Sequence, residues 1–284
     1  MKIKDLIKLL RITQWYKNFM IFLPLIFSLH LFKITDIKIT LIGFLVLCFA
    51  SSSSYIINDL KDRKKDKNHP EKKSRPLASG KIKPLTALLI SISLLLISLI
   101  IATKLSNIFF ILVLALYINT IFFYTFLLKN EPIIDLILIS INYIIRTVSG
   151  AIIINVELSP WLILCTFFLG LFLASCKRTA DFFLLDKKAG SYKIVYKKYN
   201  KDILKFIMTI STSLLILSYS LYCFFSQYLY LMFSLPFAIY TIFHFTNLVF
   251  NGSIIPRKLE MGIYDNRLLL SVLLWVWSVF IILY

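Results

Sequence analysis

The sequence predicts an all-α integral membrane protein, a bundle of about nine transmembrane helices, and two observations lead to this fold class. Apolar residues make up 59% of the chain and charged residues only 16%, against roughly 45–50% and 25% in an ordinary soluble domain. A soluble fold of 284 residues has no interior large enough for this much Phe, Ile and Leu. The apolar residues also form long runs, with Lys and Arg in blocks between them, which is typical of a membrane protein with several spans.

Residues 1–17 are expected to form an interfacial helix that leads into the first span. Ile3, Leu6, Ile7 and Leu10 recur at helical spacing, with basic side chains between them. A helix with one apolar and one basic face lies in the plane of the membrane surface. No small-residue cleavage site follows this segment, so we expect it to be part of the mature protein.

The lengths of the apolar runs favour helices over strands. A bilayer core of about 30 Å needs about 20 apolar residues per helix. The runs do not alternate apolar and polar residues as the strands of a membrane barrel do. Nine segments qualify as spans: 18–32, 38–57, 85–103, 107–127, 133–155, 159–175, 203–225, 228–250 and 268–284.

The distribution of Lys and Arg predicts the orientation. One side of the predicted topology carries 27 of these residues and the other carries 3. Loops rich in Lys and Arg stay in the cytoplasm, so we expect a multi-pass protein of the cell membrane with its basic side in the cytoplasm. This topology accounts for the net charge of +18, and no nucleic-acid partner is expected.

Two long cytoplasmic loops, 58–84 and 176–202, are expected to carry the function of a single domain that covers residues 1–284. Every loop on the non-cytoplasmic side is short. The four cysteines show no paired spacing, so neither a disulfide nor a zinc site is implied.

The first loop begins with polar and acidic residues spaced for one face of a helix. If the second span continues for two turns, Asn58, Asp62 and Asp66 stack at positions i, i+4 and i+8, next to Asp59. Such a row suits Mg²⁺, which takes a few carboxylate oxygens, keeps several waters and binds substrate phosphates. The alternative is an ordinary solvated loop that only supports the topology. The regular spacing beside so many lysines favours the metal site.

Cationic side chains near both loops indicate phosphate recognition. Lys72 and Arg75 follow the acidic row, and Lys177, Arg178 and Asp181 lie at the end of the sixth span. Arg suits bidentate binding of phosphate, and Lys acts as a point charge. Acidic metal ligands beside such cations can bind a metal–diphosphate complex. The residues of the sixth span have an alternative role in a simple salt bridge at a helix end, which stabilises little.

Charges inside a span are functional candidates by default. Asp135 and Arg146, eleven residues apart in the fifth span, lie nearly on one face but too far apart along the axis to pair. Two roles remain open for Arg146, an anchor for a neighbouring helix or a residue of the substrate cavity. His244 is expected to be a bundle residue with its hydrogen bonds satisfied.

Several motifs together resemble the UbiA superfamily of intramembrane prenyltransferases, and within it the decaprenyl-phosphate phosphoribosyltransferase branch. The superfamily signature is Asn58-Asp59-x-x-Asp62-x-x-x-Asp66, followed by Arg75-Pro76 and Ser79-Gly80. The blocks that favour the branch are Gln14-Trp15-Tyr16-Lys17-Asn18, His69-Pro70-x-Lys72-x-x-Arg75-Pro76, Tyr124 with Leu128-Lys129, Tyr143-Ile144-Ile145-Arg146 with Gly150, and Lys177-Arg178.

The resemblance implies a central cavity, open to the cytoplasmic face and to the bilayer, and a transferase reaction. In that reaction Mg²⁺ assists the transfer of 5-phosphoribose from phosphoribosyl diphosphate to a polyprenyl phosphate, for cell-envelope polysaccharide precursors. The expected metal ligands are Asn58, Asp59, Asp62 and Asp66. The expected catalytic residues are Asp62, Asp66, Lys177 and Arg178. The expected substrate-binding residues are Lys17, Asn18, Lys72, Arg75, Tyr124, Lys129, Arg146 and Asp181.

One departure from the wider superfamily guides the choice among alternatives. Aromatic prenyltransferases typically carry a second aspartate motif in the later loop, where this sequence reads Lys177-Arg178-x-x-Asp181. Fewer carboxylates and more cations fit two phosphorylated substrates better than a prenyl diphosphate and an aromatic acceptor. A transporter predicts inverted repeats with broken helices, and the Gly and Pro positions show no such symmetry. A non-catalytic scaffold leaves the acidic row unexplained.

Overall fold

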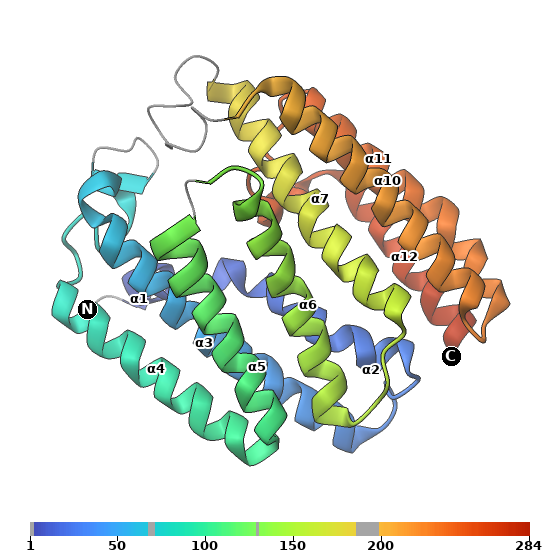
Figure 1. The fold of residues 1–284 in the computed structure, drawn as a ribbon, viewed down its shortest axis with the longest axis horizontal. Coiled ribbons are helices and arrows are strands. Elements are labelled where there is room, and N and C mark those ends of the chain that lie inside the picture. The colour runs from blue at the N-terminus through green and yellow to red at the C-terminus, as the bar shows by residue number, and fades with distance from the viewer. Residues whose placement is uncertain (1–2, 68–71, 129–130, 186–198) are drawn as a thin grey trace. The chain divides into compact units, whose positions relative to one another are not determined.

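A computed structural model describes residues 3–67, 72–128, 131–185 and 199–284, without side-chain detail at 184–185 (Figure 1). Within these ranges all regular secondary structure is helical, with no strand, so the predicted all-α class is confirmed. Eight helices within them are long and apolar enough to cross a membrane. The chain divides into two compact units, one comprising Met1–Leu128 and Ile145–Val156, the other Lys129–Ile144 and Glu157–Tyr284. A single domain around a central cavity stays a prediction.

The first unit holds the N-terminal helices. Its elements are α1 (Ile3–Leu10), the 3₁₀ helix η1 (Ile12–Phe22), α2 (Leu23–Phe27), α3 (Ile34–Lys67), the 3₁₀ turn η2 (Lys72–Ser74), α4 (Pro84–Leu105), α5 (Asn107–Ile118), the π-helical η3 (Asn119–Leu128) and the second half of α6 (Ile134–Ile154).

Two expectations about the N-terminal region need correction. The helix predicted over residues 1–17 is interrupted, because Arg11 adopts a left-handed conformation (φ 50°) that ends α1, and its interfacial location stays a prediction. The segment predicted as the first span, 18–32, is divided between η1 and the five-residue α2, which begins at a proline-containing turn. Leu29 then turns the chain with φ 59°. A ninth span is therefore not found in the part of the chain that the structure describes.

The helix α3 continues well beyond its predicted span and ends at Lys67. Its 34 residues make a rod about 50 Å long, against about 30 Å for a bilayer core. The expected two-turn continuation that carries the acidic row is thus confirmed. In Figure 1, α3 lies beside α4; Ser53 Oγ donates to the Ser91 carbonyl (2.8 Å), and Ser91 Oγ donates to the Ser53 carbonyl (3.0 Å). Small residues at such contacts let membrane helices approach closely.

Gly150 sets another close approach within this unit. A Cβ added there would lie 2.1 Å from the carbonyl oxygen of Ile21, so any side chain would displace η1 from the second half of α6. On the outer side, α4 leaves Leu89, Ile92 and Leu96 exposed. Exposed apolar rows of this kind are expected where a helix faces lipid.

The second unit holds the C-terminal helices. Its elements are the first half of α6, α7 (Pro160–Leu185), α10 (Lys201–Phe225), the 3₁₀ helix η5 (Leu229–Ser234), α11 (Leu235–Phe250), the 3₁₀ helix η6 (Leu259–Tyr264) and α12 (Asn266–Leu283). Phe172, Met208, Phe245 and Val249 from α7, α10 and α11 pack in one buried cluster.

Candidate functional site

Two buried carboxylates at the end of α3 share one arginine. Asp59 and Asp66 are two helical turns apart, and their residues are 4% and 3% exposed. Arg75 Nη1 donates to Asp59 Oδ1 at 2.8 Å and to Asp66 Oδ2 at 2.7 Å. Arg75 reaches this position because η2 and the turn after it fold the chain back against α3. The predicted proximity of the acidic row and Arg75 is therefore confirmed, with Asp59 taking a larger part than expected.

Two further cations adjoin these carboxylates. Arg11, just after α1, donates from Nη2 to Asp59 Oδ1, and Lys72 Nζ lies 3.8 Å from Asp66 Oδ1. Burial lowers the pKa of Lys72, as does the charge of Arg75, while Asp66 and Asp62 oppose the shift. The cluster therefore mixes both charge signs, as a site for a metal–phosphate complex requires. Arg11 was missed because no local pattern relates it to a residue 48 positions later.

The metal ligands remain a prediction, and the oxygen donors of these residues are of the type that Mg²⁺ prefers. Within the described ranges, no three His, Cys, Asp or Glu side chains converge as a ready-made metal cage. Mg²⁺ needs no such cage, because it binds through one or two carboxylates and substrate phosphates. Asn58 and Asp62, on the same stretch of α3, are half-buried, and hard oxygen donors of this type suit Mg²⁺.

A buried polar network surrounds Arg146 in the first unit. Arg146 Nε donates to Asn18 Oδ1 at 2.7 Å, and Asn18 Nδ2 donates to Cys48 Sγ at 3.2 Å. These bonds tie η1 to α3 and to the second half of α6. They are the contacts expected of an anchor between helices, one of the two roles considered for Arg146. The substrate-binding role of Asn18 and Arg146 stays a prediction.

Two other predicted substrate residues, Lys17 and Tyr124, lie within the described ranges. Lys17 is half-buried and lies over the rings of Tyr16 and Tyr55, at 5.8 and 6.0 Å from their centroids. Tyr124 is half-buried in η3, a π-helical stretch of the kind often found at functional sites. Lys129, like His69 of the motif, lies outside the described residues.

In the second unit, Arg178 is ion-paired with a buried carboxylate. Asp135, at the start of α6, is 0% exposed. Its Oδ2 accepts from Arg178 Nε at 2.9 Å and from Nη2 at 2.5 Å, and its Oδ1 accepts from the Tyr199 hydroxyl at 2.8 Å. Sequence reasoning noted Asp135 but missed this pairing, since α6 and α7 meet only through tertiary packing.

The neighbouring predicted residues differ in exposure. Asp181 accepts from Arg257 Nε at 2.6 Å, which attaches the segment after α11 to α7. Lys177 is exposed. Arg257 adds a cation that was missed, because no local pattern relates it to a residue 76 positions earlier. Lys177, Arg178 and Asp181 therefore all lie toward the C-terminal end of α7, where Asp135 pairs with Arg178 and Arg257 pairs with Asp181.

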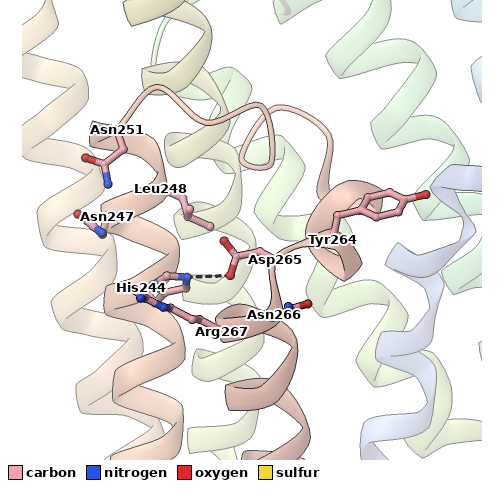
Figure 2. Close-up of a pocket in the computed structure, with 8 residues that line it drawn as sticks. All are labelled: His244, Asn247, Leu248, Asn251, Tyr264, Asp265, Asn266 and Arg267. Atoms are coloured by element: carbon pink, nitrogen blue, oxygen red, sulfur yellow. Dashed lines mark hydrogen bonds and ion pairs between the residues drawn. The ribbon is translucent and has the colours of Figure 1, made fainter.

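A pocket of about 420 Å³ lies elsewhere in the second unit, between α11 and the start of α12 (Figure 2). His244 Nε2 lies 3.0 Å from Asp265 Oδ1, which confirms His244 as a satisfied bundle residue. Asp265 accepts from the Leu268 N–H at 2.8 Å and caps α12, and these bonds lower its pKa. The lining residues are His244, Asn247, Leu248, Asn251, Tyr264, Asp265, Asn266 and Arg267; none belongs to the predicted site.

Comparisons with known proteins give relatives of the kind that the sequence motifs resemble. Decaprenyl-phosphate phosphoribosyltransferase of Mycolicibacterium smegmatis is 31% identical over 226 residues, 78% of this chain and 71% of that protein. The protein of the same name from Mycobacterium tuberculosis is 26% identical over 286 residues, 98% of this chain and 93% of the relative.

The fold also has a solved counterpart. A UbiA homolog from Archaeoglobus fulgidus, bound to GPP and Mg²⁺, superposes with a TM-score of 0.74 at 20% identity, covering 97% of this chain and 99% of that chain. Residues 19–253 match the sequence model of the UbiA prenyltransferase family. Together with the eight apolar helices, this identifies a multi-pass membrane protein. The chain belongs to the UbiA prenyltransferase family.

Proposed function

We propose that the protein transfers 5-phosphoribose from phosphoribosyl diphosphate to a polyprenyl phosphate in a Mg²⁺-dependent reaction that releases diphosphate. The product would serve the synthesis of cell-envelope polysaccharide precursors. The observation that carries this choice is Lys177-Arg178 in place of a second aspartate motif. The names of the relatives from M. smegmatis and M. tuberculosis support the same choice.

The reaction exchanges one bond at the anomeric carbon. The bond from C1 of ribose to the diphosphate oxygen breaks, and its electron pair leaves with the diphosphate. An oxygen of the lipid phosphate forms the new bond to C1. That oxygen is already anionic, so the reaction requires no strong general base. The positive character that develops at C1 resembles the oxocarbenium character of glycosyl transfer.

The end of α3 is proposed to bind the diphosphate through Mg²⁺, held by oxygens of Asn58, Asp59, Asp62 and Asp66. A bound Mg²⁺ neutralises the charge that develops on the leaving group. Asp62 and Asp66 are assigned the catalytic part of this role. The ion pairs of Arg75 with Asp59 and Asp66 support metal binding at the end of α3, because they hold two of the four proposed ligands in fixed positions.

The cations are proposed to bind the three phosphate-bearing groups: the 5-phosphate, the diphosphate and the lipid phosphate. Preorganised charges aimed at a leaving group usually make the largest contribution to such catalysis. Lys177 and Arg178 act at the leaving or attacking phosphate. The remaining substrate contacts are assigned to Lys17, Asn18, Lys72, Arg75, Tyr124, Lys129, Arg146 and Asp181. The site faces the cytoplasm at the cell membrane, and the polyprenyl chain lies in the bilayer.

A second candidate function is transfer of a prenyl group from prenyl diphosphate to an aromatic acceptor. It is considered because the Archaeoglobus structure, which contains GPP and Mg²⁺, has the same fold. One assay separates the two functions. Purified protein is incubated with Mg²⁺, polyprenyl phosphate and labelled phosphoribosyl diphosphate, and the label is expected in the lipid phase. An unlabelled lipid phase, together with turnover of geranylgeranyl diphosphate on an aromatic acceptor, would refute the proposal.

A further inference from the structure

Asp135 is a carboxylate with no solvent exposure in the first turn of a membrane span. A buried charge of this kind persists only when it is paired and hydrogen-bonded, because its desolvation is costly. Three donors satisfy Asp135: two nitrogens of Arg178 on Oδ2, and the Tyr199 hydroxyl on Oδ1. Three segments of the second unit therefore meet at one carboxylate: the start of α6, the end of α7, and Tyr199, two residues before α10.

The direction of the Tyr199 hydrogen bond is fixed by a second contact. The backbone N–H of Ile133 donates to the Tyr199 hydroxyl oxygen at 2.7 Å. A hydroxyl that accepts there has its own hydrogen available for Asp135. Burial and the charge of Asp135 raise the pKa of Tyr199, so this hydroxyl stays protonated as the donor. The chain of bonds runs in one direction, from Ile133 through Tyr199 to Asp135.

The backbone at Ile133 is strained. Its φ is 68°, a conformation that a β-branched residue rarely adopts. This same residue donates its N–H to Tyr199. Strained backbone persists where surrounding contacts over-determine it, and it is concentrated at functional sites. An ordinary salt bridge at a helix end has no need of this support.

We infer that Asp135 and Tyr199 are positioning residues that hold the guanidinium of Arg178 for binding a substrate phosphate. This inference rests on the proposed function, in which Arg178 binds phosphate. The carboxylate fixes the guanidinium along its Nε–Nη2 side, and Tyr199 fixes the carboxylate from its other oxygen. Neither residue touches the substrate. Their effect on phosphate binding passes entirely through Arg178.

Tyr199→Phe is the decisive variant, because it removes the hydroxyl and keeps the ring in its cluster with Leu136 and Leu204. Asp135→Asn is less suitable, because it leaves Arg178 buried without its counter-ion and endangers folding. Tyr219→Phe is the matched control. Tyr219 is 8% exposed against 6% for Tyr199, and its hydroxyl bonds to Ser234 and to Trp275 at 2.7 and 2.9 Å, away from Arg178.

Binding and turnover are measured on the full chain in nanodiscs. The Kd values of Mg²⁺–phosphoribosyl diphosphate and of polyprenyl phosphate come from microscale thermophoresis, which needs no turnover. The ligand whose Kd rises in Arg178→Lys is the ligand that Arg178 binds. Tyr199→Phe is expected to raise the Kd and the KM of that same ligand about 3–10-fold and to leave kcat within about twofold. Tyr219→Phe should leave both Kd values unchanged.

A double variant separates positioning from general structural damage. If Tyr199 acts only through Arg178, Tyr199→Phe adds no further loss of binding in the Arg178→Lys background. Wild-type Kd values in Tyr199→Phe, or equal losses in both backgrounds, would overturn the inference. Wild-type protein that binds both ligands without transferring pentose refutes the proposed function alone, and the Kd comparison still decides the inference. Wild-type protein that binds neither ligand overturns both.

Discussion

Replacing Arg75 by alanine is expected to destabilise the protein strongly, because one side chain pairs with two buried carboxylates. Arg75 donates to Asp59 at 2.8 Å and to Asp66 at 2.7 Å. A hydrogen bond to a charged group contributes about 1.5–3 kcal/mol. The Arg75 side chain is 26% exposed, so the low end of that range applies to each bond. The expected loss in the free energy of unfolding is therefore about 3 kcal/mol.

Thermal unfolding in detergent provides the measurement, with the fluorescence of the four tryptophans as the signal. For a chain of this size, each kcal/mol lowers Tm by about 2–4 °C, so Arg75→Ala should lower Tm by about 6–12 °C. Lys73→Ala is the control, because Lys73 is an exposed cation two residues away. Its effect should stay below about 0.5 kcal/mol. Equal Tm values for the two variants would refute the inference that Arg75 stabilises the carboxylate pair.

Three further predictions test separate parts of the protein. Asp62→Ala should abolish pentose transfer and change Tm by less than about 2 °C, and an unchanged rate would contradict the proposed metal site. Gly150→Ala should lower Tm far more than Gly262→Ala, because the added Cβ meets backbone at 2.1 Å in the first case and a flexible side chain at 3.3 Å in the second; similar Tm values would argue against the close contact with η1. The third prediction concerns Asp265, whose pKa is lowered from 3.8 by the Leu268 N–H and other bonds. Its charge should stabilise the folded state above its unfolded pKa, and this contribution should be lost as pH falls through the lower folded pKa. The Tm difference between wild type and Asp265→Asn should therefore shrink between pH 6 and pH 3, and a constant difference would exclude a role for the charge.

The parts of the fold that sequence predicts well depend on local properties. The long apolar runs predicted the spans, and the spacing of Asn58, Asp62 and Asp66 predicted a helix that continues past the membrane. Both features follow from hydropathy and helical period alone. The first predicted span failed because hydropathy does not distinguish a continuous α-helix from a 3₁₀ helix followed by one short turn.

The parts that sequence could not predict are contacts between distant segments. Arg11 and Asp59 are 48 residues apart, and Arg178 and Asp135 are 43 apart. No periodicity within one helix specifies such pairs. Asp135 was compared with Arg146 because both stand on the same predicted helix, whereas its partner comes from α7. The left-handed conformations of Arg11 and Ile133 likewise have no signal in residue type, since neither is glycine.

Because α3 is unbroken, the number of residues in it fixes the directions in which the side chains of the acidic row point. Helical geometry makes the direction of each carboxylate depend on every residue between it and Ser53, which contacts α4. Deleting one residue in that interval rotates Asp59 and Asp66 by about 100° and withdraws them by about 1.5 Å. Arg75 and Arg11 would then face the wrong side of the rod. The interval from Ser53 to Asp66 should therefore tolerate no insertion or deletion, and natural length variation in relatives should lie outside it.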